Sequence, residues 1–163
     1  SGPAHAKMFE VTVYVDGKKI RISVKNDAAN TKNTVSFTVN DKLEQYYDFA
    51  CYDCPTPSIL NIGNLNSTLY ALVLAGNRPY LVNLDDNSKP VELKHPAVDF
   101  SSKSDSIETA YFRGKSSGFM TRQYDGEPGS STVYWIDCYK YDLTETNADK
   151  KWEKISFKPS TLL

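Results

Sequence analysis

The sequence lacks both a long hydrophobic run and an excess of either charge. Its longest apolar stretch, residues 69–75, has the length of a strand and falls well short of the ~18 residues of a membrane-spanning helix. We therefore expect no membrane span. The 19 basic and 20 acidic residues give a net charge of −1, so no net positive field favours nucleic acid as a partner. The densest basic cluster, Lys18, Lys19, Arg21 and Lys25, is typical of a solvated hairpin face.

Metal-ligating residues are scarce, with three cysteines and two histidines in the whole chain. A structural zinc site needs four such ligands, usually as two close pairs. The only close pair is Cys51 and Cys54, and its possible partners Cys138 and His95 are distant in sequence. We therefore expect no metal and no other cofactor.

The cysteines leave two interpretations open. Cys138 could form a disulfide with either Cys51 or Cys54, which would join a loop to a core strand, or all three thiols could be reduced. A redox role for Cys51 and Cys54 is not favoured, because Pro55 and the second proline that follows do not begin the helix on which such a pair depends.

Motifs of catalysis and nucleotide binding are also missing. The chain contains no G-x-S-x-G, Walker A, dinucleotide-binding or H-E-x-x-H sequence. We predict that it is not an enzyme. The alternative is a hydrolase that uses carboxylates from distant strands, with Asp137 the best candidate, or His95 as a base.

What the sequence has in abundance is residues that favour strands. It has 11 tyrosines, seven phenylalanines and two tryptophans, with many Val, Ile and Thr residues. The clearest strand pair covers residues 9–24, where apolar and polar residues alternate on both sides of Asp16-Gly17. This dipeptide favours a two-residue type I′ turn, which places Phe9 opposite Val24 and two further apolar pairs on the same face.

This opening hairpin resembles the first hairpin of a ubiquitin-like β-grasp domain. That fold continues with an amphipathic helix, whereas residues 26–34 have almost no apolar periodicity, so the resemblance ends at the hairpin.

A third alternating run covers residues 35–39. Leu43, Tyr46 and Tyr47 then have a spacing that predicts one short helix near residues 42–50, and a strand is the alternative. Residues 51–68 are predicted to form a long irregular loop with short extended pieces, the first place to look for function.

The second half repeats a pattern of strand, polar turn and strand. The hairpins at residues 80–93 and 139–157 each have an aromatic strand, an acidic turn and a lysine-containing return strand, and they resemble single blades of kelch- or hemopexin-type propellers. A closed propeller needs at least four four-stranded blades, which is more than this length comfortably supplies. The prediction is therefore an all-β, mainly antiparallel, sandwich-like or barrel-like domain of about ten strands.

The strand at residues 133–143 is predicted to be central, because both of its faces carry large apolar side chains. We interpret residues 1–7, which precede Met8, as a cloning or cleavage scar or a disordered tail. Residues 8–163 are then a single β-rich domain.

The predicted function is that of a recognition or adhesion module, which binds a protein or a glycan through loops and exposed tyrosines. Tyr46, Tyr47 and Tyr52 are the predicted binding residues, because they lie close to the cysteine pair. Asn66 begins the only N-glycosylation sequon, so we expect an extracellular or cell-surface glycoprotein. The alternative is a cytoplasmic or viral accessory domain that binds proteins with its thiols reduced. The sequence gives no oligomeric state.

Overall fold

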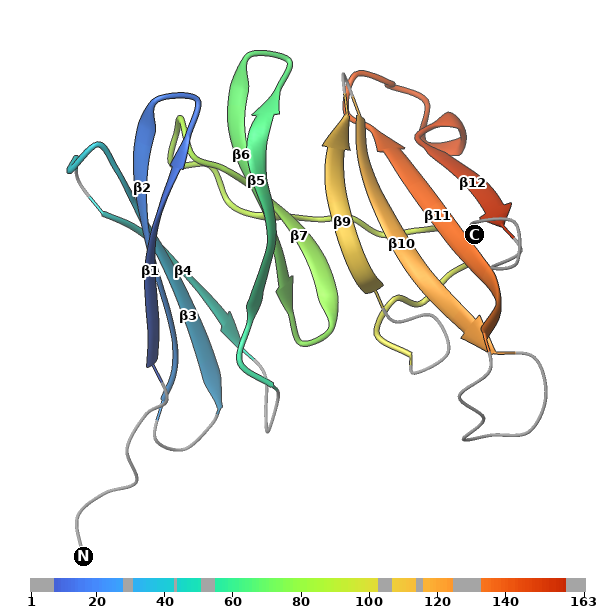
Figure 1. Ribbon diagram of the computed structural model, residues 1–163, viewed down its shortest axis with the longest axis horizontal. Coiled ribbons are helices and arrows are strands. Elements are labelled where there is room, and N and C mark those ends of the chain that lie inside the picture. Colours follow the sequence, from blue (N-terminus) through green and yellow to red (C-terminus); the bar gives the residue numbers. More distant parts are fainter. Residues whose placement is uncertain are drawn as a thin grey trace, which may run out of the picture.

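The computed structural model describes residues 8–27, 31–42, 44–50, 55–102, 107–113, 116–124 and 133–157. Within these ranges, twelve strands form three antiparallel four-stranded sheets, which follow one another along the chain and lie side by side (Figure 1). The first sheet contains β1 (Met8–Val15), β2 (Lys18–Asn26), β3 (Lys32–Val39) and β4 (Gln45–Ala50). The middle sheet contains β5 (Ser58–Leu65), β6 (Thr68–Ala75), β7 (Arg78–Asn83) and β8 (Val91–Glu92).

The third sheet contains β9 (Ile107–Arg113), β10 (Ser116–Tyr124), β11 (Val133–Asp142) and β12 (Trp152–Phe157), with a single 3₁₀ turn, η1 (Ala148–Lys150), before the last strand. The all-β antiparallel class is confirmed. The sandwich or barrel arrangement is not, because the described strands form three separate sheets.

The opening hairpin has the predicted register. Phe9 lies opposite Val24, Val11 opposite Ile22 and Val13 opposite Ile20. Asp16 and Gly17 have φ values of 48° and 76°, as a type I′ turn requires at both central positions. The turn chemistry and the alternating pattern therefore select one register, and the first sheet grows from it.

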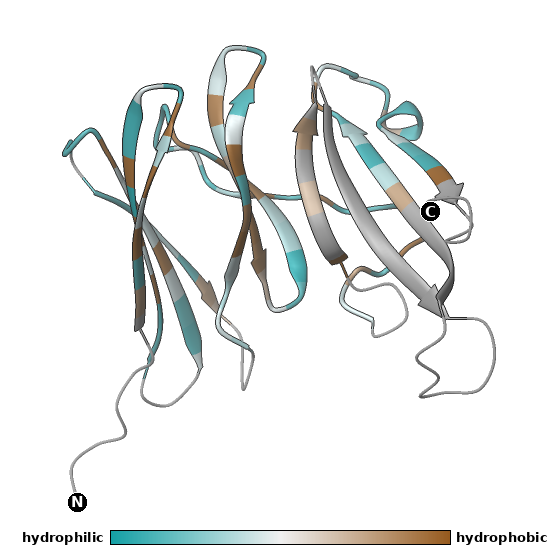
Figure 2. Ribbon diagram, in the orientation of Figure 1, coloured by the Kyte–Doolittle hydropathy of each residue, from teal (hydrophilic) through white to brown (hydrophobic). Residues whose placement is uncertain are grey.

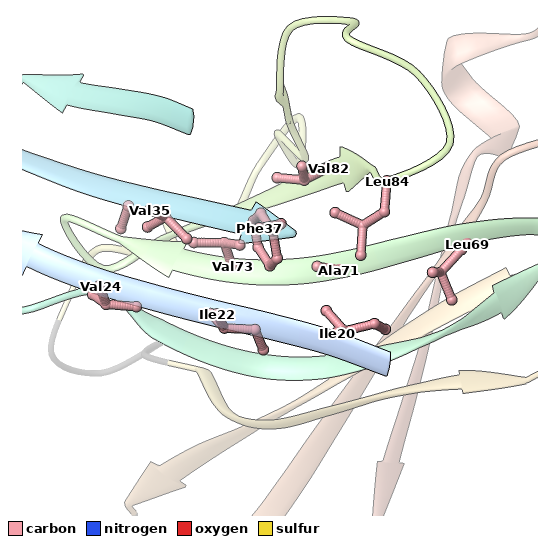
Figure 3. Close-up of a cluster of buried hydrophobic side chains, with 11 residues drawn as sticks. Ile20, Ile22, Val24, Val35, Phe37, Leu69, Ala71, Val73, Val82 and Leu84 are labelled. Carbon is pink, nitrogen blue, oxygen red and sulfur yellow. The ribbon is translucent and has the colours of Figure 1, made fainter. Parts of the chain in front are cut away.

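The middle sheet is buried on both faces. Successive residues of β6 point to opposite sides of this sheet, and each side packs against a neighbouring sheet. Leu69, Ala71 and Val73 pack against the first sheet. Figure 3 shows them with side chains of β2 and β3, such as Ile22 and Phe37. Leu72, between them, packs against the third sheet. This explains why β6 is the longest apolar run in the sequence.

The three sheets stand in a row, and their first strands, β1, β5 and β9, lie on the same side of this row. Near this edge β5 and β9 are in close contact: the Asn61 side chain donates a hydrogen bond of 3.1 Å to the Ala110 carbonyl. A Cβ at Gly63 would lie 3.0 Å from Phe112 Cδ2, so glycine provides the space for this ring. Consecutive four-stranded sheets with neighbouring first strands are the arrangement of propeller blades. The two hairpins that resemble blades are the outer halves of two sheets, β7–β8 and β11–β12.

The short helix predicted near residues 42–50 was wrong, and its alternative, a strand, is confirmed. Residues 45–50 form strand β4, because Tyr47 and Phe49 point toward the core while Tyr46 and Asp48 face outward, with a period of two. The loop predicted at residues 51–68 needs a correction too, because the eight-residue strand β5 lies where only short extended pieces are expected. A register shift between Ile59 and Asn61 hides its alternation in the sequence.

The predicted central strand is confirmed. β11 lies between β10 and β12, and Cys138, Tyr139 and Tyr141 are buried. Residues 1–7, interpreted as a scar or tail, lie outside the described residues.

Candidate functional site

The strongest candidate surface is the outer face of the first sheet, the face that points away from the middle sheet. Alternation places polar side chains on it, because the intervening residues of β1, β2 and β3 fill the core. Figure 2 shows the resulting alternation of hydrophilic and hydrophobic residues along these strands. Its described members include Glu10, Thr12, Tyr14, Lys19, Arg21, Ser23, Lys25, Lys32, Thr34, Ser36, Thr38, Tyr46 and Asp48.

Two tyrosines project from this polar face. Tyr14 on β1 is 72% exposed and Tyr46 on β4 is 68% exposed, which makes them the most exposed large hydrophobic residues of the described chain. A cross-strand row runs from Glu10 through Ser23 and Ser36 to Tyr46. The short side chain of Ser36, opposite Tyr46, leaves that ring uncovered, whereas Tyr14 lies opposite Lys19, and Arg21 is exposed on the same face.

A hollow of about 350 Å³ lies beside Tyr46 at the end of the same face. Asp48 accepts a 2.6 Å hydrogen bond from the Thr34 hydroxyl, and its other oxygen lies 3.9 Å from Lys32 Nζ. Asp27, on the rim, accepts hydrogen bonds from the hydroxyl and the backbone N–H of Thr31, and these bonds lower its pKa. The hollow therefore has both carboxylate and ammonium groups around it, beside the aromatic ring of Tyr46.

The three tyrosines predicted to form one site are not brought together. Tyr46 faces outward, as a binding residue would. Tyr47 points inward: its ring lies 6.5 Å from that of Phe37, its hydroxyl donates to Gln45 Oε1 at 3.0 Å, and burial raises its pKa. Tyr52 lies outside the described residues. The sequence reasoning missed Tyr14, although its place in the alternating run of β1 puts it on the polar face.

His95, the predicted alternative catalytic base, has structural contacts. Its Nδ1 accepts hydrogen bonds from the backbone N–H groups of Ala97 at 3.0 Å and Val98 at 3.2 Å. The ring centroid lies 5.2 Å from those of both Tyr139 and Trp152. Burial lowers the pKa of the imidazole, and the positive charge of Lys154 lowers it further. A neutral ring is therefore favoured at this junction between the middle and third sheets.

The other predicted site residues are spread over the molecule. Asp137 lies on β11 opposite Thr121 and Ser156, and its side chain is outside the described part. Cys138 is 3% exposed on the same strand, while Cys51 and Cys54 lie outside the described residues, so the disulfide stays a prediction.

Asn66 occupies the tight turn between β5 and β6, with φ of 54°, and is exposed. An acceptor at this position is accessible, and its glycosylation stays a prediction.

No family model, no curated protein and no solved structure matches the chain. In the described part of the chain, no group of three or more His, Cys, Asp or Glu side chains is arranged to hold a metal ion. None of the described helices has the length and apolarity that a membrane crossing requires.

Proposed function

We propose that the chain is a non-enzymatic recognition module and that the outer face of its first sheet binds a protein partner. The observation that carries this proposal is the exposure of Tyr14 and Tyr46 on one polar sheet face. Tyrosine is enriched among residues that dominate binding energy, because its rigid ring buries a large area and its hydroxyl can still form a hydrogen bond.

The charges of this face also support a protein partner. Exposed Arg21 and Lys25 lie near Glu10 and Asp48, so both signs are interspersed over a short distance. Such a surface favours a partner with a complementary pattern of charges, because like charges brought together on binding are costly. The hollow beside Tyr46 offers a place for one side chain of the partner.

The surroundings of His95 support the non-enzymatic part of the proposal. A general base needs a nitrogen that is available to the proton it removes. Nδ1 already accepts two backbone hydrogen bonds, and aromatic rings lie against the imidazole. A hydrolase that uses His95 is the less favoured alternative.

An extracellular or cell-surface location remains part of the proposal, supported by the exposed sequon residue Asn66. The alternative, a cytoplasmic or viral accessory domain with reduced thiols, would use the same binding face.

The binding face can be tested with a photo-crosslinking amino acid placed at position 14, at position 46 and, as a control, at exposed position 153 in the third sheet. We expect one discrete protein adduct from positions 14 and 46 and none from position 153. With the purified partner, Tyr46→Ala should weaken binding about tenfold or more, which corresponds to the energy of a hot-spot residue. Tyr47→Phe is the matched control, because Tyr47 points inward, and it should bind as the original protein does.

Equal affinity of the Tyr46→Ala protein would contradict the proposal. So would the absence of adducts at both tyrosine positions. A loss of binding on a glycan array in Tyr46→Ala, without any protein adduct, would identify a glycan as the ligand instead.

A further inference from the structure

A second surface lies on the opposite side of the first sheet, where β1 and β5 border a groove. The groove has a volume of about 510 Å³, and none of its lining residues carries a charge. Phe9, Val11, Val13 and Val15 form one wall, and Ile59 and Ile62 of β5 stand on the other. An uncharged cleft of this kind favours apolar groups, because a buried charge would have no partner there.

The groove continues the core between the first and middle sheets. Ile20, Ile22 and Val24 of β2 are at most 1% exposed, whereas their β1 neighbours Val11 and Val13 are half-buried. Toward the start of β1 the exposure rises, and Phe9 is 54% exposed. Val11, Val13 and Val15 thus pack against this core but remain partly exposed, so further apolar side chains could still cover them.

The edge of β1 is also open. Among the described strands β1 pairs only with β2, so alternate residues direct their backbone N–H and C=O groups away from the sheet. Natural edge strands are usually protected by proline, by inward-pointing charges or by bulges. β1 has eight residues, contains no proline, points only apolar side chains inward between Phe9 and Val15, and pairs with β2 without a register shift.

We propose that an extended segment of a partner protein binds in this groove as an additional strand beside β1. Its backbone would pair with the open edge, and every second side chain, being apolar, would fill the groove. The alternate side chains would emerge on the outer face, where a basic residue is favoured beside Glu10, because cross-strand opposite charges attract. The groove lies on the opposite face of the first sheet from Tyr14 and Tyr46, and only the outward side chains of the added strand, beside Glu10 and Tyr14, would reach the tyrosine-bearing face.

The probe is a short peptide, blocked at both ends, in which valine and isoleucine alternate with threonine and lysine. Hydrogen exchange followed by NMR should show slower exchange of the outward-directed β1 amides when this peptide is added, with shift changes in β1 and β5. The third sheet should be unaffected. A version methylated on the amides that face β1 should not bind, whereas methylation of the opposite amides should leave binding unchanged, because only one edge of the added strand pairs with β1.

Two protein variants complete the test. Val13→Lys places a charge in the groove and should weaken peptide binding at least about tenfold. Val91→Lys makes the same change at an exposed valine of β8, at the opposite edge of the middle sheet from β5, and should bind the peptide as the original protein does. The two methylated peptides act on the unaltered protein, so the test holds even if Val13→Lys is unstable.

A panel of such alternating peptides that leaves the β1 amides unprotected would overturn the proposal. Equal binding of the two methylated peptides would overturn it too. Concentration-dependent dimerisation that protects the same amides without peptide would assign the groove to a second copy of the chain.

Discussion

At the scale of single residues, His95 is the side chain whose role differs most from its appearance in the sequence. As one of only two histidines it is the natural candidate for a base. In the structure its Nδ1 instead closes the turn that follows β8, and its ring joins an aromatic cluster with Phe100, Tyr139 and Trp152. Nothing in the neighbouring sequence predicts this cluster, because two of these rings come from the third sheet.

This arrangement predicts that acid destabilises the protein through His95. The pKa of the folded imidazole is lowered below its ordinary value of 6.5, so the unfolded chain takes up the proton first. The contribution to stability is therefore complete above pH 6.5 and is lost as the pH falls from 6.5 toward the lowered pKa. Urea unfolding at a series of pH values measures this loss.

His95→Asn is the informative variant. The asparagine oxygen can accept the same backbone N–H groups of Ala97 and Val98 without titrating, so the pH dependence between 6.5 and the lowered pKa should shrink. His95→Leu leaves both groups without an acceptor and should cost about 1–3 kcal/mol at neutral pH. An unchanged pH profile in His95→Asn would assign the acid sensitivity to other groups.

At the scale of elements, the opening hairpin shows how local chemistry can fix a structure. Asp16-Gly17 and the alternation on each side of it predict the register of β1 and β2, and the structure has that register. Hairpin formation needs only neighbouring residues, so the sequence is sufficient here.

The turn can be tested at Gly17. A Cβ added there meets no atom within 4 Å, so any cost of Gly17→Ala arises from the φ of 76° rather than from a clash. We expect Gly17→Ala to lower the free energy of unfolding by about 1 kcal/mol, and Gly17→Asn to lower it less, because asparagine tolerates the left-handed conformation. Chemical denaturation of the two variants compares them. An alanine variant as stable as the original protein would mean that the turn has another conformation.

Strands β4 and β5 show where local reasoning fails. The spacing of Leu43, Tyr46 and Tyr47 fits a helical turn, yet Tyr46 is exposed and the strand is set by its pairing with β3. In β5 the polar Asn61 is satisfied by a carbonyl of β9, and Gly63 gives room to Phe112. Both features depend on residues about 50 positions away, a distance that a local pattern does not include.

At the scale of the whole molecule, the middle sheet joins two separate cores. Val73 belongs to the core shared with the first sheet, and its neighbour Leu72 to the core shared with the third. Each core lies between two adjacent sheets, so each interface contributes its own share of stability, as between neighbouring units of a stacked-repeat protein.

Alanine substitutions at these two neighbours should therefore loosen different halves of the molecule. Leu72→Ala should cost about 2–5 kcal/mol and raise hydrogen exchange mainly in the third sheet. Val73→Ala removes less volume, should cost about 2 kcal/mol, and should raise exchange mainly in the first sheet. Identical exchange patterns in the two variants would mean that the three sheets open as one unit.

The β-rich class, the opening register and the central position of β11 follow from the amino-acid sequence alone, because alternation, turn residues and apolar runs act over short distances. The remaining features arise from packing between distant strands. Packing groups the strands into three sheets, buries both faces of β6, turns Tyr46 outward and Tyr47 inward, and leaves the edge of β1 open beside a groove. These outcomes depend on which face of each sheet meets another sheet, and that is settled only when distant strands pack together.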